Sequence, residues 1–576
     1  MVQKFVSQHN FSVVPQVNLP RSNFSRPHER KFTFDAGYLV PFYWEEVLPG
    51  DTINLTHSIF CRLLSPLSYP IMDNLWLETF YFYVPERLTW THWKAFNGEN
   101  KNPVSNPNPT TYTIPQISAP TTLGFDVGSI ADYLGIPVGV PNISIRASWH
   151  RAYNLIYNEW FKDENLIDDA PQYDDDTTRD DTDYPLRRRG KRFDYFTSAL
   201  PWPQKGPAVE IPLGTSAPVF GDGYGLKIMS ENSKVYSPQF MSNSPTRIDI
   251  TDSSGDNALP YTISSMSGTA PVGHSILGVA SKTALTDSSG NITKSGLIAD
   301  LSTATSATIN SLREAFAYQK LFERDARGGT RYTEIIRSHF GVISPDARQQ
   351  RPEFLGSSSD MLQINTVVQN SQTTSSSALG ELSAFGLCST VKHGFIKSFS
   401  EHGVILGLMN IRADITYQKG INRAFNRKER FDFYYPALAN IGEQAILNKE
   451  IFAQGTSVVD SNGNIVDDKV FGYIGRWDEY RYKPSEICGL LRSDFGARAS
   501  YSSGGSTITN TSLDAWHLSQ KFNNLPTLNQ TFIEDNPPID RVEAITNLPQ
   551  FICDCHFDQK HTRVMPMYNI PGKGVL

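Results

Sequence analysis

The sequence predicts a mainly β protein, a jelly roll with long loop insertions and a few α-helices. Aromatic residues fill 12% of the chain and charged residues only 19%, a composition typical of strands with large buried contact surfaces. Gly occupies 40 positions and Pro 36, so turns are frequent. The predicted strands lie far apart, separated by long excursions, and no repeat of solenoid length is present.

Length and charge narrow the class of protein. The 576 residues fit one large β-domain with insertions as well as about four average domains. Lys and Arg number 52 against 59 Asp and Glu, a net charge of −7. This charge argues against a protein that binds nucleic acid through bulk positive charge. A hydrophobic content of 39% is enough for a core and argues against global disorder.

Neither secretion nor membrane insertion is expected. The first sixteen residues lack the apolar core of a secretory signal. The longest clean apolar stretch, Val404–Met409, is far shorter than the roughly 20 residues of a spanning helix. The odd number and wide spacing of the cysteines fit a reducing cytoplasm better than a disulfide framework. The five cysteines are Cys61, Cys388, Cys488, Cys553 and Cys555.

The N-terminal third begins with an arm and continues with strands. Residues 1–34 are polar, punctuated by Pro and weakly basic, which predicts an extended N-terminal arm. Apolar and polar residues mostly alternate over Ile53–Ile59, as in a half-buried strand. Leu75–Val84 is apolar at nearly every position, so we expect a strand covered on both faces and ended by Pro85. Residues 86–130 are rich in Pro, Asn and Thr and are predicted to be mostly loop.

A helix and two charged blocks follow. Residues 146–161 carry one apolar stripe at helical spacing. Its members are Trp149, Ala152, Tyr153, Ile156, Tyr157 and Trp160. Residues 163–183 then hold ten acids and one Arg, directly before the basic run Arg187–Arg192. We expect the acidic block to be solvated or to form salt bridges with the basic run across subunits. A divalent ion bound near Asp174–Asp176 is kept as an alternative, although the block lacks the ligand alternation and the Gly of an EF-hand.

Residues 214–300 are predicted to be a surface insertion. Ser, Thr and Gly fill 30 of the 70 positions from 241 to 310. Two near-repeats, residues 251–256 and 286–291, are typical of hairpin tips. The tip residues are Asp252, Gly255, Asp287 and Gly290. The flanking ranges, 35–213 and 301–576, are expected to form the jelly-roll domain with its helical loop insertions.

Two helices are expected after the insertion. The apolar spacing of Ile309–Phe322 predicts a helix ended by Gly328 and Gly329. Thr330 is expected to cap a second helix that runs to about residue 340 and ends at Gly341.

Strands and a turn complete the chain. One parity of Val404–Tyr417 is apolar and the other polar, which predicts a long strand with one buried face. Asp460–Asn464 is a hairpin-turn sequence between apolar runs. Residues 551–558 alternate again and predict a final strand.

The residues point to no enzyme, cofactor or metal. P-loop, dinucleotide, HExxH and GxSxG motifs are absent from the sequence. Cys553, Cys555 and His556 lie close in sequence, but a closed zinc site needs four ligands and no second knuckle exists. The alternation explains both thiols as small buried side chains. With 59 acids, chance carboxylate pairs are plentiful. A β-rich carbohydrate-binding or glycoside-cleaving protein therefore stays as the alternative.

Seven stretches rich in Arg, aromatic and turn residues are spread along the chain. They are Phe32–Pro41, Phe196–Gly206, Glu323–Phe340, Ser344–Arg348, Tyr480–Pro484, Phe522–Leu528 and Asn536–Arg541. In order and content they resemble the major capsid protein of the microviruses, specifically of the gokushoviruses, a branch of small circular single-stranded DNA bacteriophages. The resemblance covers essentially the whole chain apart from roughly residues 214–300.

The resemblance implies a structural, non-enzymatic virion protein. It implies an eight-stranded viral jelly roll and about sixty copies in a T=1 icosahedral shell around single-stranded genomic DNA. It also implies three partners: an internal scaffolding protein, a DNA pilot protein and a small basic DNA-packaging protein. Assembly would take place in the cytoplasm of the bacterial host. In this branch an insertion of the capsid protein rises around the three-fold axes, where we expect residues 214–300 to contact a host cell surface receptor. The alternative is a disordered or shell-buried insertion without a receptor role.

The N-terminal arm is a candidate DNA contact. Residues 1–31 carry five basic residues against one acid, a net charge of +4. We expect four of these cations to lie near genome phosphates. They are Arg21, Arg26, Arg30 and Lys31. The competing interpretation is that the arm only connects neighbouring subunits and does not contact the DNA.

Overall fold

The structure is a computed structural model. It describes residues 20–101, 104–105, 111–209, 309–374, 378–493 and 513–568, and the backbone of seven short strands between them. The chain divides into two compact units. One comprises residues 1–205 and 322–576, and the other residues 206–321.

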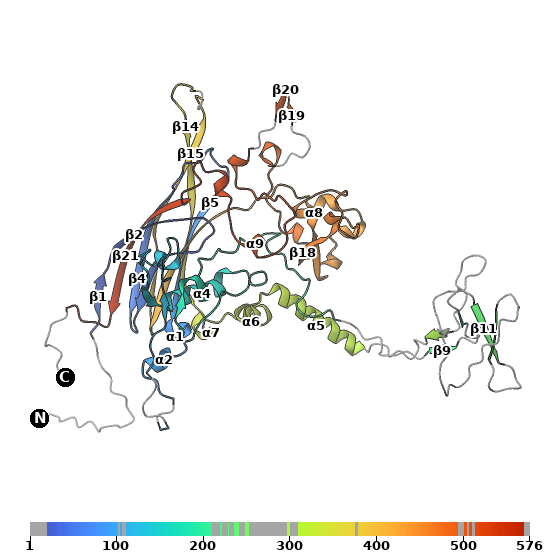
Figure 1. The fold of residues 1–576 in the computed structure, drawn as a ribbon, viewed down its shortest axis with the longest axis horizontal. Coiled ribbons are helices and arrows are strands. Elements are labelled where there is room, and N and C mark those ends of the chain that lie inside the picture. Colours follow the sequence, from blue (N-terminus) through green and yellow to red (C-terminus); the bar gives the residue numbers. More distant parts are fainter. Residues whose placement is uncertain are drawn as a thin grey trace. The chain divides into compact units, whose positions relative to one another are not determined.

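One curled antiparallel sheet organises the first unit (Figure 1). Its strand order is β1-β21-β4-β15-β14-β5-β16-β3, and β2 also pairs with β21. The bounds are β1 (Ser22–Ser25), β2 (His28–Phe34), β3 (Val40–Val47), β4 (Thr52–Leu63), β5 (Leu75–Pro85), β14 (Glu353–Val368), β15 (Leu382–Ser398), β16 (Gly403–Ala413) and β21 (Phe551–Arg563). The mainly β jelly-roll prediction is confirmed. The sheet has nine strands instead of the eight that the resemblance implies, and the N-terminal segment supplies two of them, β1 and β2, which both pair with β21.

Two hydrophobic clusters explain the burial of the central strands. The first lies within the curl of the sheet and includes side chains of β2, β3, β4, β5, β16 and β21. The second packs helix α4 (Ser148–Ile156) against β5 and β16. The predicted strand Leu75–Val84, covered on both faces and ended at Pro85, is therefore confirmed as β5.

The strand predicted over Val404–Tyr417 is only partly correct. All eleven residues of β16 are buried, including the polar Asn410 and Arg412, and the strand ends at Ala413. The sequence pattern predicted one exposed face. Helix α4 packs with the apolar start of that face, whereas Asn410 donates to the Tyr38 carbonyl and Arg412 donates to Glu78. The alternation within a single strand does not reveal these partners.

The predicted helix over residues 146–161 is confirmed. Helix α4 continues directly into a π-helical turn, Tyr157–Phe161. The stripe residues Ala152, Tyr153 and Ile156 are fully buried and pack against the sheet.

The remaining helices are short except α5 and α6. Their bounds are α1 (Glu86–Thr89), α2 (Trp93–Phe96), α3 (Ile130–Tyr133), α5 (Ile309–Arg327), α6 (Tyr332–Phe340), α7 (Asp346–Gln349), α8 (Asn448–Ile451) and α9 (Gln530–Ile533). The predicted ends at Gly328 and Gly341 are confirmed, and Gly341 has the left-handed φ of +69° typical of a C-cap. The predicted cap by Thr330 is wrong. Arg331 precedes α6 without a side-chain cap, and the Thr330 hydroxyl donates to Asn165 instead.

Small sheets flank the main one. The hairpin of β17 (Glu443–Leu447) and β18 (Val470–Gly475) packs on a third hydrophobic cluster. The predicted turn at Asp460–Asn464 is confirmed, since the Asp460 amide donates to the Asn464 carbonyl at 2.9 Å. The other strands of this unit are β6 (Gln116–Ser118), β7 (Ser144–Arg146), β8 (Arg179–Asp180), β19 (Ser500–Ser503) and β20 (Ser506–Thr509).

The second unit contains five short described strands. They are β9 (Val219–Gly221), β10 (Ile228–Met229), β11 (Val235–Phe240), β12 (Ile248–Asp252) and β13 (Leu297–Ala299). β9 pairs with β13, and β10, β11 and β12 form an antiparallel sheet. Of the predicted tip residues, Asp252 is the last residue of β12, whereas Gly255, Asp287 and Gly290 lie outside the described residues.

Candidate functional site

The first two predicted DNA-contacting cations lie at the start of the sheet and bond to it. The Arg21 guanidinium donates to the Thr52 hydroxyl on β4 at 3.0 Å. The Arg26 guanidinium donates to the Glu45 carboxylate on β3 at 2.9 Å. Glu45 is almost buried, whereas 47% of the Arg26 side chain is exposed. These cations therefore hold the arm against the sheet and keep one face in solvent.

The other two cations lie on β2. The Arg30 guanidinium donates to the Phe42 carbonyl at 2.9 Å, and burial lowers its pKa. The Lys31 ammonium lies 3.3 Å from Glu29 and 3.4 Å from Asp554 on β21. The Lys31 side chain is 64% exposed. Of the two, Lys31 is the cation that an external anion reaches more easily.

The acidic block bonds to its own neighbourhood. Asp175 pairs with Arg179 at 2.8 Å, and Asp176 accepts from the Trp90 indole at 2.6 Å. Asp174 accepts from the Thr91 hydroxyl. Across the described ranges, no group of three or more His, Cys, Asp or Glu side chains is arranged to hold a metal ion.

The basic run enters the core, and within the described ranges its side chains form no hydrogen bond or ion pair with the acidic block. Arg189 and Arg192 both donate to Glu78 on β5, and Arg412 on β16 donates to the same carboxylate at 3.0 Å. Burial alone would raise the pKa of Glu78, but the three guanidinium groups outweigh it and lower the pKa to about 2. Salt bridges of the acidic block across subunits stay a prediction. We call Glu78, Arg189, Arg192 and Arg412 the Glu78 cluster.

Three cysteines form a row across adjacent strands. Cys388 on β15, Cys61 on β4 and Cys553 on β21 lie directly opposite one another. All three are buried and free, as is Cys555. Burial raises the pKa of Cys388 to about 12, so the thiol stays protonated. Alternation on β21 leaves His556 exposed on the opposite face, which confirms that Cys553 and Cys555 are small buried core residues.

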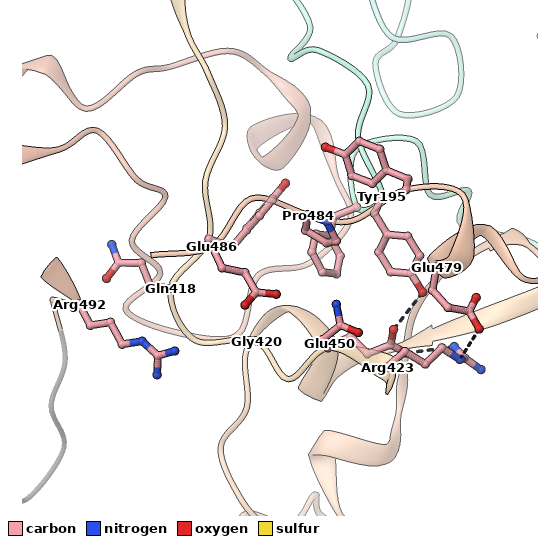
Figure 2. A pocket seen from close by; sticks show the side chains of 13 residues that line it. Tyr195, Gln418, Gly420, Arg423, Glu450, Glu479, Pro484, Glu486 and Arg492 are labelled. Carbon is pink, nitrogen blue, oxygen red and sulfur yellow. Dashed lines mark hydrogen bonds and ion pairs between the residues drawn. The ribbon is translucent and has the colours of Figure 1, made fainter. Parts of the chain in front are cut away.

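A narrow pocket is lined by three glutamates, Glu450, Glu479 and Glu486, among tyrosine and arginine side chains (Figure 2). Glu450 accepts from the Tyr195 hydroxyl at 3.0 Å and from Arg423 at 3.1 Å. Glu479 accepts from the Gln444 amide at 2.6 Å, and Arg423 lies 3.9 Å from it. Burial raises the pKa of Glu450, while Arg423 opposes that shift.

The dimensions of this pocket do not fit a substrate. Its volume is about 30 Å³, whereas small-molecule sites hold roughly 300–1,000 Å³. A glycosidase needs two carboxyl groups on either side of a sugar. Glu450 and Glu479 are instead occupied by neighbouring donors, so this pair gives the carbohydrate-cleaving alternative no support and serves to fix the local fold.

An exposed aromatic segment is the most distinctive surface feature, and sequence reasoning missed it. We define it as residues 425–435, in which Phe425 is 83% and Phe431 64% exposed. Phe433, Tyr434 and Tyr435 are exposed as well. Arg427 braces the segment, because its guanidinium lies 4.3 Å from the centre of the Tyr480 ring and 3.3 Å from Glu479. The run RAFNRKERFDFYYP, aromatic without periodicity, was the available signal.

A jelly roll with a braced, exposed aromatic surface is typical of a structural subunit that other molecules cover. The family model described as Capsid protein (F protein) matches residues 12–573. The chain belongs to this family of capsid proteins, which confirms the resemblance seen in the sequence. It is a structural protein of the virion and not an enzyme.

Three relatives match nearly from end to end. Capsid protein VP1 of Bdellovibrio phage phiMH2K is 43% identical over 571 residues, covering 98% of each chain. Capsid protein VP1 of Chlamydia phage 1 is 41% identical over 606 residues, again with 98% of each chain. Capsid protein VP1 of Spiroplasma virus 4 is 34% identical over 585 residues, 98% of this chain and 97% of the relative. No helix in the described part of the chain has both the length and the apolar character to cross a bilayer.

Proposed function

We propose that this chain self-assembles in about sixty copies into a T=1 icosahedral shell that encloses circular single-stranded DNA. The aromatic segment is the observation that carries the proposal. Its rings stand on the surface although burial would remove them from water. Aromatic and Arg side chains are the residues that dominate protein interfaces. A neighbouring subunit would bury these rings.

Electron microscopy tests the assembly directly. The chain is expressed together with its scaffolding, pilot and packaging partners, and the product is imaged after gradient purification. The proposal expects closed icosahedral particles that contain nuclease-protected DNA. Soluble monomers under all conditions would contradict it.

The net charge of the chain implies that another protein neutralises most of the charge of the genome. A subunit with a net charge of −7 cannot neutralise DNA by itself. A small basic DNA-packaging protein is therefore proposed to supply most of the positive charge. An internal scaffolding protein and a DNA pilot protein are proposed as further partners during assembly in the bacterial cytoplasm.

The arm is proposed to add local phosphate contacts. Its cations are Arg21, Arg26, Arg30 and Lys31, of which Lys31 and Arg26 expose much of their side chains. The combined variant Arg21→Gln and Lys31→Gln keeps the buried Glu45 paired and tests this role. Packaged DNA should be released at a lower salt concentration, because each lost phosphate contact weakens retention. If the variant packages DNA with normal yield and normal salt sensitivity, the phosphate role is wrong and the arm only connects neighbouring subunits.

Residues 214–300 are proposed to protrude around the three-fold axes and to serve attachment to a host cell surface receptor. Their Ser, Thr and Gly content and sparse charge support this role. Closing a long loop costs only about 0.6 kcal/mol per doubling of its length, so the jelly roll tolerates the insertion. Replacing the insertion with a short Gly/Ser linker should give assembled particles that no longer adsorb to cells. Unchanged adsorption would refute the attachment role, and failed assembly would place the segment in the shell.

A further inference from the structure

The start of helix α6 is held by a segment that lies about 170 residues earlier in the chain. We call residues 158–165 the clamp segment. The Glu164 carboxylate in this segment accepts from the backbone amides of Thr330 and Arg331, the second at 3.3 Å. A carboxylate near the first turn of a helix is also favoured by the helix dipole. Glu164 therefore anchors the start of α6.

The Arg331 guanidinium strengthens this contact. It donates to the Glu164 carboxylate at 2.8 Å, to the Asn158 carbonyl at 2.8 Å and to the Lys162 carbonyl at 3.0 Å. Three acceptors of the clamp segment thus converge on one side chain. The position of α6 against the segment is fixed by polar bonds.

A second carboxylate meets the same guanidinium. The Arg331 Nη1 atom that bonds Glu164 also lies 3.5 Å from Glu334, in the first turn of α6. The other oxygen of Glu334, Oε2, is buried and has no hydrogen-bond donor among the described residues. A Cβ at Gly329 would overlap this oxygen, so Oε2 packs directly on the Gly329 backbone.

Two ionised carboxylates at one guanidinium repel each other, whereas a protonated carboxyl group donates a hydrogen bond. One proton on Glu334 would thus remove the repulsion and supply a donor to Glu164. Burial, together with the hydrogen bond to Glu164, raises the pKa of Glu334 to about 7. Burial alone would raise the pKa of Glu164, but hydrogen bonds from Glu334 and Thr330 outweigh it and lower that pKa.

The charged groups around the pair come from several elements. Lys205 acts on both carboxylates and donates to the Thr330 hydroxyl at 2.7 Å. Asp163 in the clamp segment and Asp325 on α5 add negative charge, and Asp325 pairs with His339 of α6 at 2.6 Å.

The remaining charged residues on the wall of the adjoining cavity bond to groups outside the pair. They are Lys162 with Asp169, Arg189, Arg192 and Arg412 with Glu78, Lys191 with the Phe532 carbonyl, Arg327 with Glu443, and Asp478 with Arg481. Arg331 is therefore the cation that bonds both carboxylates, and one guanidinium balances only one negative charge.

Helix α6 depends on these contacts because it has little apolar burial. No residue of α6 is fully buried, and Tyr332 is 73% and Phe340 77% exposed. Gly328 and Gly329 join α5 to α6, and Gly329 has a left-handed φ of +94°. The contacts of the clamp segment thus determine how firmly an exposed apolar helix is held beside a glycine pair.

We propose that Glu164 and Glu334 form a pH-sensitive latch, in which one shared proton holds the start of α6 on the clamp segment and loss of that proton loosens it. This inference concerns the single subunit and goes beyond the proposed assembly, so the two can fail independently.

The latch should be tightest at mildly acidic pH. The raised folded-state pKa of Glu334 gives a contribution that is complete below the unfolded value of 4.5 and is lost as pH rises through about 7. The lowered pKa of Glu164 gives a contribution that is present above 4.5 and is lost as pH falls through its folded-state value. Opening of the latch should therefore increase on both sides of a minimum.

Hydrogen exchange on the purified full-length subunit, measured by mass spectrometry, tests the alkaline side. Protection factors, which remove the intrinsic pH dependence of exchange, are determined for the peptide of residues 328–334. The opening constant of this peptide should rise about tenfold or more between about pH 5.5 and pH 8.5. A peptide from β5 reports global unfolding. The same rise in the β5 peptide would show that the whole subunit opens and would overturn the proposal.

Two variants of the pair should abolish this rise. Glu334→Gln keeps a donor for Glu164 but carries no proton to lose. Glu164→Gln gives Glu334 a neutral neighbour, so its carboxylate ionises without repulsion. Glu159→Gln, which removes a partly buried carboxylate of the clamp segment outside the pair, is the matched control and should retain the rise.

Circular dichroism checks that the variants fold, and each variant of the pair tests the proposal without the other. Loss of the rise in the pair variants and its retention in Glu159→Gln would support the latch. A wild-type peptide with constant protection, a rise that persists in a folded pair variant, or loss of the rise in Glu159→Gln would each overturn it.

Discussion

Two buried glutamates of this chain respond to pH in opposite directions. The guanidinium groups around Glu78 outweigh burial and hold its pKa at about 2. Burial, assisted by the charges of Asp540 and Asp35, raises the pKa of Glu543 to about 7. Neither carboxylate oxygen of Glu543 has a hydrogen-bond partner among the described residues. Glu78 is therefore stabilised as an anion, whereas Glu543 is stabilised as a neutral acid.

Glu78→Gln should destabilise the subunit. At pH 7 we expect a loss of about 3–5 kcal/mol in the free energy of unfolding, because three guanidinium groups lose their shared counter-charge. A lowered folded-state pKa contributes stability above the unfolded value of 4.5, and that stability disappears as pH falls toward 2. The difference from wild type should shrink over that range in urea titrations. Glu46→Gln, in an exposed pair with Arg146, is the control and should cost under about 1 kcal/mol.

Glu543→Gln should stabilise the subunit at alkaline pH. A raised folded-state pKa gives stability that is complete below the unfolded value of 4.5 and is lost as pH rises through about 7. The neutral amide removes this dependence, so the melting temperature at pH 8 should rise above that of wild type. Glu99→Gln, at an exposed position, should leave the pH profile unchanged. A parallel pH profile in Glu543→Gln would show that this carboxylate ionises freely.

Elements with strong local periodicity were predictable from the sequence. The strands β4, β5 and β21 and helix α4 follow from spacing alone, because burial on one or both faces leaves a pattern in neighbouring residues. The burial of the second face of β16 was not predictable, since its partners, among them helix α4, Tyr38 and Glu78, lie more than about 200 residues earlier in the chain.

The candidate sites were less predictable than the elements. Lys31 was recognised as a cation, but its partner Asp554 lies on a strand at the other end of the chain. The same limit applies to the Glu78 cluster, whose members come from β5, the basic run and β16. The aromatic segment has neither strand nor helix period, so pattern analysis passed over it.

Gly394→Ala should disrupt the pairing of β15 with β4. A Cβ at Gly394 would overlap the Leu55 carbonyl of β4, a backbone atom that cannot move aside without separating the strands. We expect a loss of about 2 kcal/mol or more in the free energy of unfolding. Ser389→Ala, at an exposed position on the same strand, should stay within about 0.5 kcal/mol of wild type. Equal stabilities of the two variants would mean that the strands separate at little cost.

At the scale of the whole molecule, we expect folding and assembly to depend on different residues. The hydrophobic clusters that hold the sheet lie within one subunit. The aromatic segment is exposed and joins none of them. Substitutions in the segment should therefore separate the two processes.

The double variant Phe431→Ser and Tyr435→Ser should fold but fail to form particles. Both rings are exposed, so the thermal unfolding of the free subunit should be unchanged, whereas loss of central aromatic contacts removes much of an interface energy. Electron microscopy and size-exclusion chromatography measure the outcome. Leu123→Ser, a 70% exposed apolar residue elsewhere, is the control and should assemble normally. A normal particle yield from the double variant would exclude the segment as an interface.

The position of strand β21 in the sheet also determines when the sheet can form during translation. It lies between β4 on one side and β1 and β2 on the other, and its partners precede it by about 500 residues (Figure 1). A ribosome delivers these residues after every other strand of the sheet, so a nascent chain cannot complete the sheet until β21 has been translated. A prematurely terminated product lacks β21 and leaves β4 with an unpaired edge. The fold thus restricts a complete sheet to chains that have been translated through β21.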